Sequence, residues 1–66
     1  MSQQRIVVQE AEKLDSLLAR LDLLPKIQSG IQQVFVNGEV ISAEKTQSTT
    51  VGPQDLVVVL PVLRGG

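Results

Sequence analysis

The shortness of the chain limits its fold more than any other feature of the sequence. A domain of 66 residues buries only about 60% of the surface that its unfolded chain exposes, so one core must supply nearly all of the stability. The chain contains no cysteine and no histidine, so disulfide bonds and the usual zinc ligands cannot supplement that core. The core must therefore come from well-patterned helix and strand, or partly from an oligomeric partner.

Composition excludes several classes of function. Hydrophobic residues make up 42% and charged residues 20% of the sequence, which is ordinary for a globular protein and too apolar for a disordered one. The formal net charge of -1 offers no basic surface to nucleic acid or to an anionic membrane. The lack of cysteine and histidine also removes the thiol nucleophile and the commonest general base. We therefore expect neither independent catalysis nor a metal site.

The length of the apolar runs and the residues at the N-terminus indicate where in the cell the protein is expected. The longest apolar run, residues 56–63, has the length of a strand and is far shorter than the roughly 20 residues of a membrane span. Residues 1–4 lack the cationic-then-apolar order of a signal peptide. The expected location is the cytoplasm.

Leucines at helical spacing predict one amphipathic helix. The apolar positions recur at intervals of three and four residues and form one stripe: Ala11, Leu14, Leu17, Leu18 and Leu21. Glu10 and Glu12 fall in the first turn, where carboxylates interact favourably with the helix dipole. Pro25 interrupts the pattern, so the helix is expected to end near Leu23. The stripe is interpreted as core rather than as a binding surface.

Four segments rich in β-branched and other apolar side chains predict strands: residues 5–9, 32–36, 39–41 and 56–60. Asn37-Gly38 between the second and third is the strongest short hairpin signal, because both central positions of a type I′ turn need a positive φ. The last segment is apolar at every position, which is typical of a central strand.

The segments between these elements are expected to be loops and turns. Residues 26–30 and 42–50 are interpreted as irregular, and residues 52–55 as a turn in which Asp55 has a structural role. Pro61 cannot donate a hydrogen bond to a strand partner, so it marks the end of the last strand.

The order strand, helix, hairpin, strand predicts an α+β domain with one helix packed on one face of a mixed sheet of four to five strands. The first and last strands are expected to be parallel neighbours, with the helix covering a right-handed crossover. Residues 1–61 are assigned to the domain and residues 62–66 to an extended tail.

The C-terminus is the feature that points to function. Gly65-Gly66 could be a flexible end with no role. Alternatively, the carboxylate of Gly66 enters a narrow site on another protein, for which glycine is suited because it has no Cβ. A strand that leads directly into such a tail projects the carboxylate away from the domain, where a partner enzyme can reach it.

Residues 34–41, residues 55–62 and the closing Gly65-Gly66 together resemble the ubiquitin-like β-grasp sulfur carriers. These are the ThiS and MoaD family of thiazole and molybdopterin synthesis, with their archaeal modifier relatives. The similarity covers about residues 10–66. The hairpin alone is a weak motif, but the ordered set of hairpin, Asp-led strand, proline and terminal glycines is fairly specific. The last four residues, Leu63-Arg64-Gly65-Gly66, also resemble the tail of ubiquitin.

The resemblance implies that the protein is a substrate rather than an enzyme. In that family an adenylating enzyme of the ubiquitin-activating type uses ATP and magnesium to convert the terminal carboxylate, here on Gly66, to an acyl adenylate. A persulfide donor then yields a thiocarboxylate, which donates sulfur at a synthase subunit in cofactor or metabolite synthesis. The carrier itself needs no bound cofactor.

The partners are expected to recognise the tail through Val62, Leu63, Arg64 and Gly65. Arg64 has the chemistry to pair with an acidic patch on the activating enzyme. Phe35, the only aromatic residue, lies in an alternating strand and is interpreted first as core, with a partner surface as the other interpretation.

Two departures from the family pattern affect these expectations. Only about nine residues precede the helix where the family has a two-stranded hairpin, so we expect the edge strand to be missing and the central one to be kept. The flank left exposed could recruit a second copy and give a weak homo-oligomer. The molybdopterin-type tail has one residue between Pro-Val and Gly-Gly, whereas this chain has Leu63 and Arg64.

Two other functions therefore stay open beside the sulfur carrier. The first is a ubiquitin-like modifier joined through Gly66 to lysines of other proteins, which the two-residue spacing in the tail favours. The second is a β-grasp interaction subunit with an inert tail. The downstream synthase, metabolite or target protein is left open by the sequence.

Overall fold

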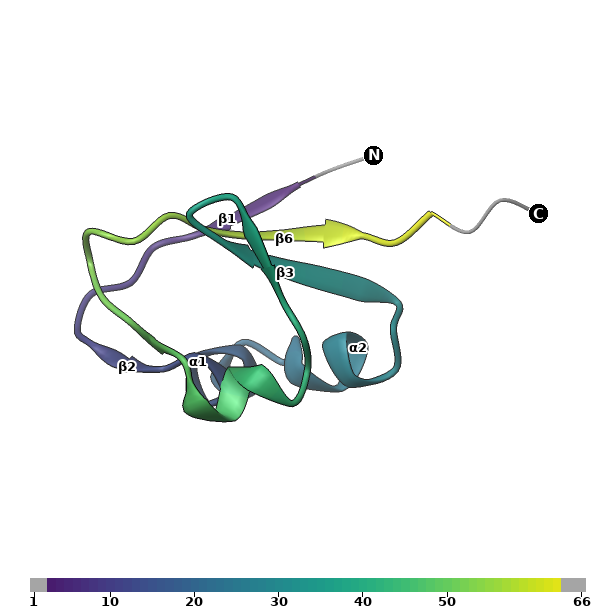
Figure 1. The fold of residues 1–66 in the computed structure, drawn as a ribbon, viewed down its shortest axis with the longest axis horizontal. Helices are drawn as coiled ribbons and strands as arrows, with labels where there is room; N and C mark the ends of the chain where they lie inside the picture. The colour runs from purple at the N-terminus through teal and green to yellow at the C-terminus, as the bar shows by residue number, and fades with distance from the viewer. Residues whose placement is uncertain (1–2, 64–66) are drawn as a thin grey trace.

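The computed structural model describes residues 3–63, and its helices lie on one side of a four-stranded sheet (Figure 1). The sheet has the order β1-β6-β3-β4 and is made of β1 (Gln4–Ile6), β6 (Val57–Pro61), β3 (Gln32–Val36) and β4 (Glu39–Ile41). A second sheet pairs β2 (Glu12–Lys13) with β5 (Thr50–Val51). The helical elements are α1 (Leu14–Arg20), α2 (Leu24–Gln28) and the 3-10 helix η1 (Lys45–Ser48).

The expected α+β fold with one main helix on one face of a sheet is confirmed, but the sheet is not mixed. Within residues 3–63 every strand pair is antiparallel, including β1 with β6, where Ile6 lies opposite Val57. The expectation of a parallel, central first strand is wrong, because β1 lies at the edge of the sheet. The reason is connectivity: β2 follows closely and pairs with β5, just before β6 begins, so β1 must end beside the start of β6.

The hairpin of β3 and β4 has the predicted boundaries and turn. Asn37 and Gly38 have φ values of 53° and 85°, the left-handed pair that a type I′ turn needs. The Asn37 side chain also fixes the turn to the start of β6. Its amide nitrogen donates to Asp55 Oδ1 at 2.9 Å, and its amide oxygen accepts from the Leu56 backbone nitrogen at 2.9 Å. Residues 52–55 form the expected turn, with Asp55 N donating to Gly52 O at 3.0 Å.

The predicted helix is shorter than expected and is followed by a second one. α1 ends at Arg20 because Asp22 adopts a left-handed conformation with φ 59°. Asp22 N donates to Ala19 O and Leu23 N donates to Leu18 O, which is the Schellman arrangement.

Pro25 therefore does not end α1 but lies in the first turn of α2, where its missing N–H costs nothing. The expected loop at residues 26–30 is wrong, because α2 extends to Gln28.

The core lies between the sheet and the helices. Its buried side chains come from every layer: Ile6, Val8, Leu14, Leu17, Leu18, Leu23, Ile27, Val34, Ile41, Val51, Val57 and Val59. Ala11 and Leu21, expected on the buried stripe, are exposed, because α1 begins after Ala11 and ends before Leu21.

Residues 42–50 are more regular than expected, because they contain η1 and the first residue of β5. Thr46 of η1 is fully buried and donates to Ala43 O at 2.6 Å.

Candidate functional site: the open sheet face and the root of the tail

The face of the sheet opposite the helices carries a row of apolar side chains. Side chains alternate along a strand, and those of Val34, Val57 and Val59 are buried under the helices. Their neighbours along the strands therefore point to the other side. Phe35 lies there between its strand partners Val58 and Val40.

We call the set formed by Phe35, Val40, Val58 and Leu60 the open face. Val40 is 50% exposed, and the other three side chains are half-buried. Phe35 is therefore not part of the buried core, so its first interpretation is wrong. The four residues are uncharged, and Arg5 of β1 lies beside them, opposite Val58 on the same face of the sheet. A largely apolar surface of this kind is suited to contact another protein.

β6 leads from the open face to the C-terminus. The strand runs along the middle of the sheet between β1 and β3, and its last residue, Pro61, lies opposite Gln32 (Figure 1). Val62 continues this alignment, because its backbone nitrogen donates to Ile31 O at 2.9 Å. Leu63 follows and is 70% exposed. We call Pro61, Val62 and Leu63 the tail root.

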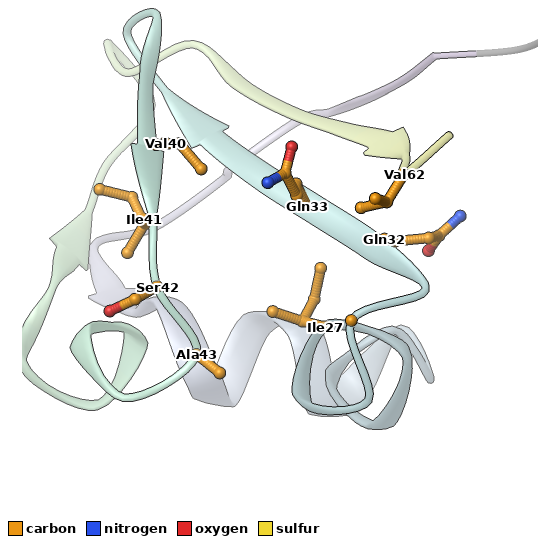
Figure 2. Close-up of a pocket in the computed structure, with 9 residues that line it drawn as sticks. Ile27, Gln32, Gln33, Val40, Ile41, Ser42, Ala43 and Val62 are labelled. Atoms are coloured by element: carbon orange, nitrogen blue, oxygen red, sulfur yellow. The ribbon is translucent and has the colours of Figure 1, made fainter. Parts of the chain in front are cut away.

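A pocket of about 300 Å³ lies beside the tail root (Figure 2). It is formed where β4 separates from β3. β3 pairs with β4 only as far as Val34 opposite Ile41, whereas its pairing with β6 continues to Gln32 opposite Pro61. Ile27 of α2 lies below this gap, and Val62 lies at its other side.

The predicted site residues are only partly brought together. Phe35 lies on the sheet opposite Val58 of β6. Val62 and Leu63 follow the end of β6, so the same strand connects these residues to the sheet position of Phe35. Arg64, Gly65 and Gly66 lie outside residues 3–63. Sequence analysis missed Val40, Val58 and Leu60, although the alternation of buried and open positions in the two strands carries that signal. It also missed the pocket, for which no local pattern exists.

One electrostatic feature of the described residues lies at the turn beside the sheet. Hydrogen bonds from the Asn37 side chain and from the Gly52 backbone nitrogen hold the pKa of the Asp55 carboxyl below its ordinary value of 3.8. Elsewhere, Arg20 and Glu12 form a two-point ion pair at 2.9 Å on the helix side. Both features stabilise the fold, and neither lies on the open face.

Within residues 3–63 no three acidic side chains gather in a way that could hold a metal ion. The same residues include no helix that is long and apolar enough to cross a membrane. The remaining features are a largely apolar sheet face with Arg5 at its side, an uncharged pocket, and a strand that leads to the tail root. Such a surface fits a protein that is held by other proteins.

Fold and surface together define a small domain of the β-grasp class, with its main helix on one face of the sheet and its last strand leading out to the C-terminus. A family model described as "ThiS family" matches residues 1–66, and the chain belongs to that family. Comparison with curated proteins gave no match, and comparison with solved structures also gave none. Members of the ThiS family are small sulfur carriers rather than enzymes, and they work with activating enzymes and synthases.

Proposed function

We propose that this protein carries sulfur as a thiocarboxylate on Gly66. The main support is the match of the family model over the whole chain, which includes the terminal Gly65-Gly66. The placement of β6 in the middle of the sheet supports the same proposal, because a strand held on both sides gives the tail a rigid base. The open face beside it supplies an apolar surface on which a partner can rest.

The proposed chemistry needs no catalytic group on the carrier. The Gly66 carboxylate attacks the α-phosphorus of ATP on an adenylating enzyme of the ubiquitin-activating type, with Mg²⁺, and pyrophosphate leaves. A persulfide then attacks the carbonyl carbon of the acyl adenylate and displaces AMP. A thiol then attacks the donor's sulfur in the resulting acyl disulfide, so that a disulfide forms between the thiol and the donor and the thiocarboxylate is released on Gly66. A synthase holds this sulfur nucleophile beside its acceptor at high effective concentration.

The tail residues have separate roles in this proposal. Gly65 and Gly66 pass through the narrow part of the enzyme site because they have no Cβ. Arg64 pairs with acidic groups on the activating enzyme, and Val62 and Leu63 dock in an apolar groove. We place the protein in the cytoplasm, where ATP and the partner enzyme are available.

A second candidate function is a protein modifier. The two residues between Pro61-Val62 and the terminal glycines give the ending Leu63-Arg64-Gly65-Gly66, which is that of ubiquitin. In this case the acyl adenylate leads to an isopeptide bond with a lysine amine of another protein, instead of to a thiocarboxylate. The first step is common to both functions, so only the product distinguishes them.

The intact mass of the protein from its native host, purified without a C-terminal tag, tests these proposals. A species that is heavier by the difference between sulfur and oxygen, located at Gly66, would establish the carrier. Higher-mass conjugates that disappear on deletion of Gly66 would establish the modifier. Unchanged mass after incubation with ATP, Mg²⁺ and the adenylating enzyme of the host would exclude both functions and leave an interaction subunit with an inert tail.

A further inference from the structure

The pocket beside the tail root has a chemistry of its own. Its walls are mainly aliphatic and come from three separate segments: Ile27 from α2, Ile41 and Ala43 from β4 and the following loop, and Val62 from the tail root. Gln32 and Gln33 add neutral amides, and none of the lining residues is charged. The pocket therefore does not suit a phosphate, a carboxylate or a metal ion, but it suits an uncharged apolar group.

Gln32 also lines the pocket, but its side-chain oxygen is shielded from solvent and accepts no hydrogen bond from any residue in the described range 3–63. An incoming group could not reach this atom, so the contact that the pocket offers is apolar.

The position of the pocket indicates what covers it. Val62 forms one wall, and its hydrogen bond to Ile31 keeps the chain extended past the pocket toward the terminus. Leu63, the next residue, is 70% exposed, so its side chain does not fill the pocket. An enzyme that holds Gly66 in its active site also comes close to the tail root, whose last residue, Leu63, lies three residues before Gly66.

We propose that the pocket receives a bulky apolar side chain of the adenylating enzyme. This inference rests on the proposed function and adds a second point of contact to it. The enzyme then grips the carrier at the base of the tail while the terminus reaches the reaction centre. The open face supplies area, and the pocket fixes the position of the tail.

A larger side chain at a residue that lines the pocket would fill it, and such a variant tests this proposal. Ala43→Leu places three more carbon atoms in the space between Ile41 and Ile27. Ala19→Leu makes the same change on the exposed surface of α1 and is the matched control. The rate of ATP–pyrophosphate exchange is measured with the adenylating enzyme of the host at increasing carrier concentration. We expect Ala43→Leu to raise KM about tenfold with kcat nearly unchanged, and Ala19→Leu to leave both unchanged.

A second measurement uses the unaltered chain and so does not depend on how the variant folds. The sequence has four isoleucines, of which Ile27 and Ile41 line the pocket, while Ile6 belongs to β1 and does not line it. With ¹³C-labelled isoleucine methyl groups, addition of the enzyme should move the signals of Ile27 and Ile41 and leave that of Ile6 in place.

The outcomes separate this inference from the function on which it rests. If the unaltered chain supports no exchange, the proposed function is wrong, and the pocket assignment is wrong with it. If exchange occurs but Ala43→Leu keeps its KM and the Ile27 and Ile41 signals do not move, only the pocket assignment is wrong. If deletion of residues 63–66 moves those signals in the free chain, the tail itself occupies the pocket, and the enzyme does not.

Discussion

At the residue scale, Asp55 connects the β3–β4 turn to the segment that precedes β6. Its carboxylate accepts from Asn37 on the hairpin at 2.9 Å and from the Gly52 backbone nitrogen at 2.8 Å. Leu56 N donates to the same Asn37 side chain, so one aspartate and one asparagine join the β3–β4 turn to the start of β6. These bonds favour the ionised carboxylate and lower the pKa of Asp55.

The lowered pKa predicts the sign of the pH dependence. Because the pKa of Asp55 is lower in the folded chain than in the unfolded chain, its carboxylate adds to the free energy of unfolding above the ordinary Asp pKa. That contribution is lost as the pH falls through the folded-state pKa. Asp55→Asn should therefore lower the midpoint of urea unfolding at pH 7 and flatten its decline between pH 5 and pH 2.

Glu10→Gln, at an exposed position, is the control for this comparison. It removes one carboxylate from the N-terminal part of the chain and leaves the turn intact, so the unfolding midpoint should keep the pH dependence of the unaltered protein. Equal acid sensitivity of Asp55→Asn and the unaltered chain would show that the turn contributes nothing to it.

At the element scale, the leucine stripe of α1 divides into buried and exposed members. Leu17 is 1% exposed and packs in the core, whereas Leu21 is 42% exposed because the helix has already ended. Leu17→Ala should lower the free energy of unfolding by about 2–5 kcal/mol, which is a large part of the total for a domain of this size. Leu21→Ala should change it by less than about 0.5 kcal/mol. Urea unfolding followed by circular dichroism measures both, and similar losses would place Leu21 in the core.

The β3–β4 turn and the end of α1 show where sequence patterns are sufficient to predict structure and where they are not. Asn37-Gly38 predicted its turn correctly because the two residues themselves supply the required positive φ values. The end of α1 was not predicted because Asp22, rather than glycine, takes the left-handed position. Pro25 is expected to end the helix, but proline is also well tolerated in the first turn of a helix, and here it lies in the first turn of α2.

The local sequence pattern also could not predict whether β1 runs parallel or antiparallel to β6. Ile6 predicts a buried strand position whether the strand runs parallel or antiparallel to its neighbour. The direction depends on the short connection that leads from β1 to β2, and on the pairing of β2 with β5. A few residues of connection therefore decided the topology, while the alternation of side chains decided which face is buried.

At the scale of the whole molecule, the sequence singled out Phe35 and Val62, but it did not predict the surfaces to which they belong. The open face joins β3, β4 and β6, and the pocket joins α2, the loop after β4 and the tail root. Ile27, Ala43 and Val62 are widely separated along the chain and share no motif. Their proximity follows from the register of the sheet, which is a property of the folded molecule.

The weak homo-oligomer expected from the sequence stays a prediction. Among the described residues 3–63, β1 has a strand partner on one side only, and Val7 just after it is 78% exposed. This flank adjoins the open face, because β1 pairs with β6 and Arg5 lies opposite Val58.

The open face gives the last prediction, which concerns the whole carrier. If the activating enzyme rests on this apolar surface, a charge at its centre must weaken the complex without unfolding the domain. Phe35→Lys introduces such a charge between Val58 and Val40, and the aliphatic part of lysine still covers part of the neighbouring side chains. Gln9→Lys makes the same change in net charge at an exposed position on the segment between β1 and β2 and is the matched control.

We expect Phe35→Lys to raise KM for the carrier in ATP–pyrophosphate exchange about tenfold, which corresponds to about 1.4 kcal/mol of binding free energy. Gln9→Lys should leave KM unchanged, and both variants should unfold cooperatively at temperatures that show folded chains in the assay. Equal KM values for the two lysine variants would mean that the enzyme recognises the tail and its root alone. The apolar row would then belong to a different partner, of which the synthase that takes the sulfur is the first to test by the same pair of variants.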